Sequence, residues 1–184
     1  MKSLAITSRS FSKNPILRRE VLKLYPGAKF NDDELKLCGD SLVEFLYGYE
    51  KAITALEVID DSILSKLPHL KSIAKYGVGL DMIDLRAMKK NNVKLGWTGG
   101  VNKRSVSELV VSFAVALLHR AVFANSEVKK EQWYQVKGSQ LSNSTFGIIG
   151  CGHIGKDLVK LLKPFNCKIL AYDILNFKEF YEKN

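Results

Sequence analysis

Apolar residues along the first hundred positions alternate between short runs typical of buried strands and spaced patterns typical of amphipathic helices. Apolar runs predict strands at 2–8, 28–31, 52–56, 70–76 and 93–97. Helices are predicted between them: 16–24 after Asn14-Pro15, a region from Asp32 or Asp33 to Tyr49 broken at Gly39, 61–67 after Asp60-Asp61, and 84–91. Alternating strands and helices form a parallel sheet with right-handed crossovers. The pattern therefore predicts a first α/β unit.

A long apolar helix is predicted after the loop at 98–102. Ser105 or Ser107 can cap this helix, and Glu108 would complete a capping box with Ser105. The apolar positions of 109–118 continue into a more polar stretch that reaches Trp133. Such a helix is usually part of a core or a subunit interface. The loop marks the expected boundary between units 1–98 and 99–184.

A glycine-rich motif lies within the second unit, after the long helix. The sequence Phe146-Gly-Ile-Ile-Gly-Cys-Gly-His-Ile-Gly155 has the spacing G-x-G-x-x-G after an apolar run. Gly150 would allow a tight strand-to-helix turn, Gly152 would let the backbone approach a pyrophosphate, and Gly155 would let the helix pack against the sheet. The phosphates would lie at the positive end of the helix dipole.

The residues after the motif provide the context that a dinucleotide fold requires. Apolar positions at 158, 161, 162 and 165 predict a helix with one buried face, and 167–172 reads as a second parallel strand that ends at Asp173. An acid at this point can accept the ribose hydroxyls and would repel a 2′-phosphate, which favours NAD over NADP. The competing reading is an ordinary βαβ turn without a ligand.

Composition narrows the class of protein. The chain has 184 residues, 46% of them hydrophobic and 26% charged, which is typical of a globular protein. The net charge of +9 is spread over short basic pairs without interleaved aromatics, so nucleic-acid binding is not expected. No apolar run is long enough for a membrane span, and a cytoplasmic location is expected. Cys38, Cys151 and Cys167 lack metal-type spacing.

Four segments together resemble the D-isomer-specific 2-hydroxyacid dehydrogenases, and the phosphoglycerate dehydrogenase branch in particular. They are Lys75-Tyr-Gly-Val-Gly-Leu-Asp-Met-Ile-Asp-Leu85, Asn102-Lys-Arg-Ser-Val-Ser-Glu108, the glycine motif, and Tyr172-Asp173. The resemblance implies a flavodoxin-like substrate-binding domain over 1–98 and a Rossmann NAD-binding domain that starts within 99–184. It also implies homodimers that pack around the 105–133 helix region.

The resemblance assigns roles by position. Lys75, Val78, Gly79 and Asn102 would contact the substrate, with the N–H groups of Val78 and Gly79 holding its carboxylate. Thr98 and Val106 would lie near the nicotinamide. Gly150, Gly152, His153, Ile154 and Gly155 would hold the pyrophosphate and Asp173 the ribose. His153 replaces an arginine common in the family, and Gly99-Gly100 replaces a proline-containing turn.

The family's chemistry is hydride transfer between a 2-hydroxy acid and the nicotinamide. A histidine exchanges the proton, a glutamate tunes that histidine, and an arginine binds the substrate. In the family these three residues follow the second strand of the cofactor domain, in segments that this sequence does not contain. We therefore expect a C-terminally truncated chain that is inactive alone. The alternative is a non-catalytic, dimeric NAD(H)-binding module.

Overall fold

The computed structural model describes residues 2–183. The chain divides between Thr98 and Gly99 into two compact units, which coincides with the boundary expected from the sequence. The functional roles expected for these two units stay predictions.

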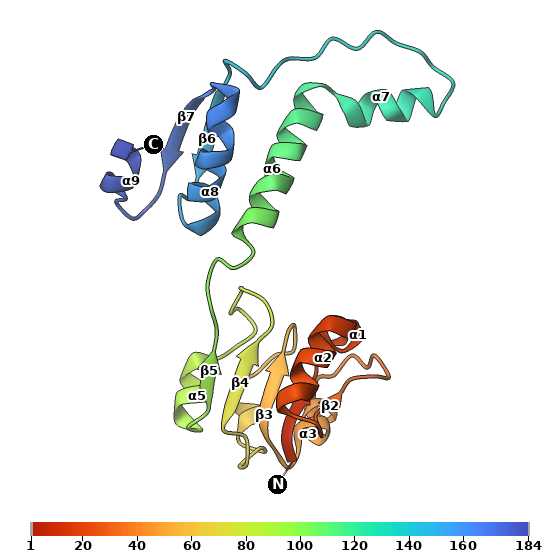
Figure 1. Cartoon of the computed structure of the whole chain (residues 1–184), viewed down its shortest axis with the longest axis vertical. Helices are drawn as coiled ribbons and strands as arrows, with labels where there is room; N and C mark the ends of the chain where they lie inside the picture. The colour runs from red at the N-terminus through yellow and green to blue at the C-terminus, as the bar shows by residue number, and fades with distance from the viewer. Residues whose placement is uncertain (1, 184) are drawn as a thin grey trace. The chain divides into compact units, whose positions relative to one another are not determined.

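The N-terminal unit is built on one parallel sheet (Figure 1). Its strands are β1 (Lys2–Ile6), β2 (Lys29–Phe30), β3 (Tyr49–Thr54), β4 (Ser72–Lys75) and β5 (Lys94–Gly96). They are arranged in the order β2-β1-β3-β4-β5, with Ala5 opposite Lys29 and Ala52, and Ile73 opposite Leu95. This is the flavodoxin-like order of a doubly wound sheet, so the predicted fold class is confirmed.

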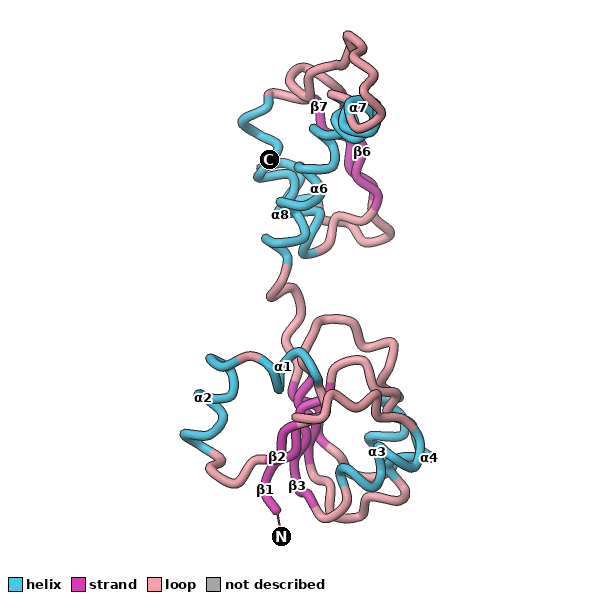
Figure 2. Tube along the Cα trace, turned by 90° about the vertical axis from the view of Figure 1, so that its right-hand side faces the viewer, coloured by secondary structure: helices cyan, strands magenta, loops and turns pink. Residues whose placement is uncertain are grey.

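Helices cover both faces of this sheet. They are α1 (Arg9–Lys13), α2 (Pro15–Leu24), α3 (Gly39–Leu46), α4 (Asp61–Leu64) and α5 (Leu85–Lys90). Figure 2 shows the strands nearly edge-on, with α1 and α2 on one side and α3 and α4 on the other. The larger core lies under α3, α4 and α5 and includes Leu42, Ile63 and Met88; a smaller core under α1 and α2 contains Ile6 and Phe11.

Three of the predicted helix starts are confirmed by their caps. The Asn14 side chain accepts hydrogen bonds from the N–H groups of Ile16 and Leu17, and Asp60 accepts one from Ile63. Asp84 accepts bonds from the first turn of α5. These side chains satisfy N–H groups that a helix leaves free at its start.

The prediction for residues 32–49 is wrong in two respects. Neither Asp32 nor Asp33 caps a helix: Glu34 has a φ of +54°, and the segment is a loop tied down by the Asn31 side chain, which bonds both the N–H and the carbonyl of Leu35. Helix α3 starts only at Gly39 and ends at Leu46, because Tyr49 already pairs in β3. The short helix α1 was not predicted, since five residues carry too little periodicity.

The C-terminal unit contains a two-stranded parallel sheet and helices around it. Its elements are α6 (Lys103–Leu118), α7 (Ala121–Val128), β6 (Thr145–Ile149), α8 (His153–Leu162), the 3-10 turn η1 (Lys163–Phe165), β7 (Lys168–Tyr172) and α9 (Lys178–Lys183). Thr145 pairs with Lys168 and Ile149 with Tyr172. In Figure 1, α8 lies against the two strands and α6 beside α8. The predicted strand, helix and strand are therefore present, as the first part of a Rossmann fold.

The core of this unit lies between α8, the strands and α6. Ile148, Leu158 and Leu162 are buried, and Val111 and Val115 of α6 pack against them. The other face of the sheet is open, with Ile149 92% and Tyr172 66% exposed. A parallel sheet normally carries helices on both faces. Within the described residues, helices thus cover only one of the two faces of this sheet.

The predicted course of the long helix also needs correction. Helix α6 starts at Lys103, so Ser105, Ser107 and Glu108 lie inside it and form no capping box. It ends before Arg120, whose φ of +52° breaks the helix, and α7 stops short of Trp133. Taken alone, no helix within 2–183 is long and apolar enough to cross a membrane; α6 and α7 reach that length only together, across a 61° bend.

Candidate functional site: the glycine turn between β6 and α8

The glycines of the turn have distinct surroundings. Gly150 has a φ of +93°, a conformation that suits glycine, and directs the chain from β6 into α8. A Cβ placed on Gly155 would lie 2.3 Å from the carbonyl oxygen of Gly150, so the helix start rests directly on the strand end. A Cβ on Gly152 would meet no atom within 4 Å. The turn is therefore tightly packed at Gly155, against the end of β6, and open at Gly152. We call this open side the mouth of the turn.

The mouth presents the free end of a helix. The N–H of Lys156 bonds the carbonyl of Gly152 at 3.0 Å, and no side chain caps α8. The N–H groups of His153, Ile154 and Gly155 precede this bond and lie at the positive end of the helix dipole. His153 and Ile154 are exposed. This donor set suits the diphosphate of a dinucleotide.

Asp173 lies directly beside the turn. Its Oδ2 accepts a hydrogen bond from the N–H of Cys151 at 2.6 Å, and its Oδ1 accepts one from Leu175 at 2.8 Å. These bonds, that from Leu175 foremost, hold the pKa of the Asp173 carboxyl below its usual value. The structure thus brings together the two features that the sequence singled out, an anion-binding turn and a carboxylate at the tip of the next strand.

Cys151 is a buried residue of the turn. Its side chain is fully buried, and this burial raises the pKa of the thiol. A thiol in this setting fits a packing role.

Helix α6 contacts the first turns of α8 through residues to which the sequence analysis gave no such role. Arg104 forms an ion pair with Asp157 at 3.0 Å, and the hydroxyl of Ser107 donates to the carbonyl of Ile154 at 3.2 Å. These partners are 53 and 47 residues apart in the chain. No local pattern in the sequence marks pairs at such distances.

Asn102, expected to contact the substrate, and Val106 and Thr98, expected near the nicotinamide, lie at the start of the C-terminal unit or just before it. Asn102 is the N-cap residue of α6, but among the described residues its side chain makes no capping bond and its buried Oδ1 has no hydrogen-bond partner. Val106 is half-buried, and Thr98 is an exposed residue at the end of the N-terminal unit. Their predicted contacts with nicotinamide and substrate stay predictions.

The residues expected to bind substrate lie at the carboxyl end of β4, where ligands of parallel sheets usually bind. Gly77 has a φ of +129°, and Val78 and Gly79 follow in the loop. The carbonyl of Val78 accepts a hydrogen bond from the indole N–H of Trp97 at 3.0 Å. The ammonium of Lys75 donates to the carbonyl of Ala55. A substrate phosphate would compete with that carbonyl for Lys75.

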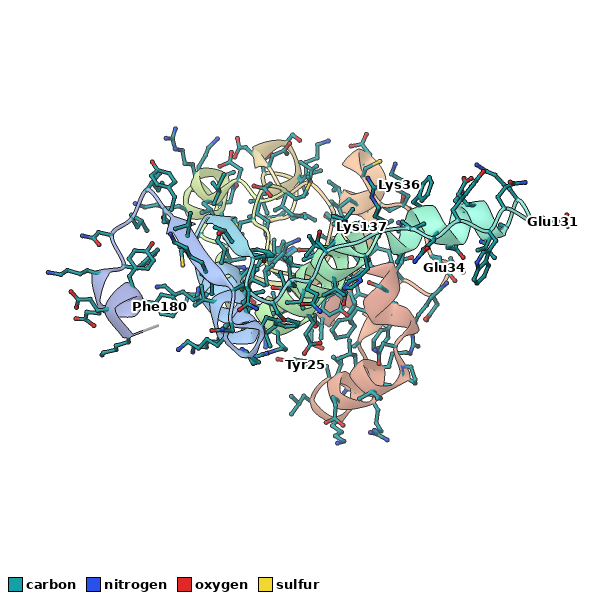
Figure 3. All side chains as sticks on the ribbon, turned by 90° about the horizontal axis from the view of Figure 1, so that it is seen from above. Tyr25, Glu34, Lys36, Glu131, Lys137 and Phe180 are labelled. Carbon is teal, nitrogen blue, oxygen red and sulfur yellow. The ribbon has the colours of Figure 1, made fainter. Side chains whose placement is uncertain are left out.

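Two hollows lie away from the turn. One of about 480 Å³ is lined by β7 and α9 and includes Phe180; another of about 520 Å³ lies between α2 and the N-terminal sheet and includes Tyr25. Figure 3 labels both aromatic residues, Phe180 in α9 and Tyr25 directly after α2. Neither hollow is lined by residues of the glycine turn. Within residues 2–183, no three His, Cys, Asp or Glu side chains gather as metal ligands.

The sequence was compared with protein families and with known proteins. The profile of the D-isomer specific 2-hydroxyacid dehydrogenase catalytic domain matches residues 13–182. The chain is 35% identical over 122 residues to glyoxylate reductase of Thermofilum pendens, covering 63% of this chain and 36% of that protein. It is 29% identical over 182 residues to glyoxylate reductase of Thermococcus litoralis, covering 94% and 54% respectively.

A solved structure agrees at the level of the fold. D-lactate dehydrogenase from Aquifex aeolicus, determined with NAD and lactic acid, superposes with a TM-score of 0.81 at 24% identity, covering 99% of this chain and 54% of that one. The chain spans about half the length of such relatives, or less. Since the family profile matches nearly all of the chain, the protein belongs to the D-isomer specific 2-hydroxyacid dehydrogenase family.

Proposed function

We propose that the chain is the dinucleotide-binding and substrate-binding portion of an NAD-dependent oxidoreductase that acts on the CH–OH group of a small 2-hydroxy acid. The observation that carries this proposal is the bond between the Asp173 carboxylate and the N–H of Cys151, 2.6 Å long, because it fixes an acid beside the open glycine turn. The turn would hold the diphosphate, and Asp173 the adenosine ribose. NAD, when bound, supplies the hydride chemistry.

The substrate would bind through the loop after β4. Consecutive N–H groups at Val78 and Gly79, after the left-handed Gly77, suit a carboxylate. Lys75 adds a positive charge at the same strand end, and its bond to the Ala55 carbonyl keeps the side chain there. By the family resemblance alone, Asn102 is assigned to the substrate, and Thr98 and Val106 to the nicotinamide. A small 2-hydroxy or 2-oxo acid fits this set of donors.

The chain by itself is proposed to bind NAD(H) without turnover. In the family, the arginine, glutamate and histidine that perform the chemistry follow the second strand of the cofactor domain, which is β7 here. All three histidines between residues 2 and 183 precede β7: His69 lies between α4 and β4, His119 is the C-cap residue of α6, and His153 starts α8.

We also propose that the protein is a homodimer that pairs through α6 and α7. Leu109, Phe113 and Leu117 recur every four residues along α6 and are 52%, 59% and 73% exposed. The opposite face of α6 packs on α8, so this stripe is free to meet a second copy. Val122 of α7 is also an apolar residue with 71% exposure. Exposed apolar stripes of this kind mark interaction surfaces.

Fluorescence titration with NADH and NADPH tests the cofactor proposal. The 184-residue chain should bind NADH and prefer it over NADPH at least tenfold. Asp173→Ser should remove most of that preference, while Asp33→Ser, in an exposed loop of the N-terminal unit, should keep it. Absence of NADH binding would refute the proposal. NADH oxidation by this chain with any member of a 2-oxo acid panel would refute the absence of turnover.

A further inference from the structure

Three contacts join the start of α6 and the loop before it to the first two turns of α8, next to the glycine turn. A Cβ on Gly100 would lie 2.6 Å from Cγ of His153, so the two residues touch. The Ser107 hydroxyl bonds the Ile154 carbonyl, and Arg104 pairs with Asp157. The N-terminal end of α6 is therefore in contact with the segment that would hold the diphosphate.

The bond from Ser107 acts on a specific peptide unit. The carbonyl of Ile154 and the N–H of Gly155 belong to the same peptide group. A hydroxyl that donates to the carbonyl polarises this group and strengthens its N–H as a donor. That N–H is one of the free groups at the mouth of the turn. Ser107 is completely buried, so water cannot readily replace its hydroxyl.

The ion pair between Arg104 and Asp157 compensates a buried negative charge close to the start of α8. The Asp157 side chain is 8% exposed, and its Oδ2 has no hydrogen-bond partner among the described residues. Asp157 lies one helical turn after His153, so its charge would repel a diphosphate at the helix start. Arg104 compensates this charge from α6. Without Arg104, a buried carboxylate one helical turn from the anion site would have no counter-charge.

We propose that Ser107 and Arg104 are positioning residues of the cofactor turn. Ser107 strengthens the Gly155 N–H as a donor to the diphosphate, and Arg104 neutralises Asp157 behind it. This inference rests on the proposed binding of NAD at the turn. Neither residue touches the cofactor in this account; both act through the first turns of α8.

The role of Ser107 is tested with a matched pair of serines on the same helix. Ser107→Ala should raise the Kd for NADH about threefold, the loss expected for one hydrogen bond. Ser107→Thr, which keeps the hydroxyl, should restore binding. Ser112→Ala is the control, because the Ser112 hydroxyl bonds the carbonyl of Glu108 within α6 itself. Equal NADH affinity in the Ser107→Ala and Ser112→Ala proteins would overturn the assignment.

The role of Arg104 is tested against its sequence neighbour. Arg104→Gln should raise the Kd for NADH about fivefold, whereas Lys103→Gln removes the same net charge from an exposed side chain and should change little. Arg104→Gln combined with Asp157→Asn should restore affinity to near wild type and keep the chain folded, because no buried charge remains. Arg104→Lys should also retain binding. Persisting weak binding in the double variant would contradict charge neutralisation.

A readout without cofactor separates this inference from the proposed function. In ¹H–¹⁵N spectra of the free protein, Ser107→Ala should move the Gly155 amide resonance, and Ser112→Ala should leave it in place. An unmoved Gly155 resonance would refute the positioning role of Ser107 even if wild type binds NADH. A moved resonance in a protein that binds no NADH would support the contact and refute only the proposed function.

Discussion

Alanine substitutions at the two glycines of the turn that begin α8 should affect different properties: cofactor affinity at Gly152 and stability at Gly155. Gly152→Ala adds a methyl group where no atom lies within 4 Å, at a φ of −73° that other residues adopt. Its effect on the free energy of unfolding should stay within about 0.5 kcal/mol. The same methyl group would take the space through which a diphosphate approaches the backbone. We expect the Kd for NADH to rise at least about tenfold, equivalent to about 1.4 kcal/mol.

Gly155→Ala should instead damage the fold. The new Cβ would lie 2.3 Å from the carbonyl oxygen and 3.2 Å from the carbonyl carbon of Gly150, and both are backbone atoms that cannot rotate away. Overpacking of this kind costs up to about 3 kcal/mol, and alanine returns about 1 kcal/mol of helix propensity. The net loss of about 2 kcal/mol should lower the Tm of a unit of this size by about 8–16 °C.

Thermal denaturation and NADH titration of the two variants provide the test. Gly27→Ala is a control in the N-terminal unit, where a Cβ also meets nothing within 4 Å. It should leave both quantities unchanged. If Gly152→Ala binds NADH as tightly as wild type, the diphosphate does not lie at this turn. If Gly155→Ala melts like wild type, α8 does not rest on the end of β6 as described.

Two further predictions concern the carboxylate and the apolar stripe. The N–H groups of Leu175 and Cys151 lower the pKa of Asp173 in the folded state. The ionised Asp173 carboxylate therefore contributes its full stabilisation above the ordinary carboxyl pKa of about 3.9, and this stabilisation is lost as the pH falls through the lower pKa of the folded state. Wild type should be more stable than Asp173→Asn at neutral pH, and the difference should shrink below about pH 4 in acid unfolding curves; a difference unchanged down to pH 2 would contradict this. In sedimentation experiments the wild-type protein should be a dimer, and Phe113→Lys should dissociate it. Ile16→Lys, which changes an equally exposed apolar residue of α2, should leave the dimer intact. A monomeric wild-type protein would refute the α6–α7 interface.

Local rules were sufficient wherever a residue's structure depends on its sequence neighbours. The Asn14, Asp60 and Asp84 caps follow from the preference of short polar side chains for free N–H groups, and the parallel sheet of the N-terminal unit follows from its alternating strands and helices. The glycine turn and Asp173 were recognisable because their spacing is fixed by the geometry of one strand, one turn and one helix.

Rules based on neighbouring residues failed to predict the structure where a contact with a residue far along the chain, or an unusual backbone conformation, determines it. Ser107 has the sequence context of a helix cap, but its hydroxyl is used by Ile154, 47 residues further on. Arg120 interrupts an apolar pattern that would suit one continuous helix, because it adopts a left-handed conformation. The loop after Asn31 replaces a predicted helix because the buried Asn31 side chain binds its backbone. Such contacts become visible only when the chain is folded.

The most direct measurement is a crystal structure of this chain with NAD. The account predicts diphosphate oxygens within about 2.7–3.2 Å of the backbone nitrogens at 153–155, and ribose hydroxyls on the Asp173 carboxylate. A dinucleotide bound elsewhere, or a diphosphate that does not contact these nitrogens, would contradict the account.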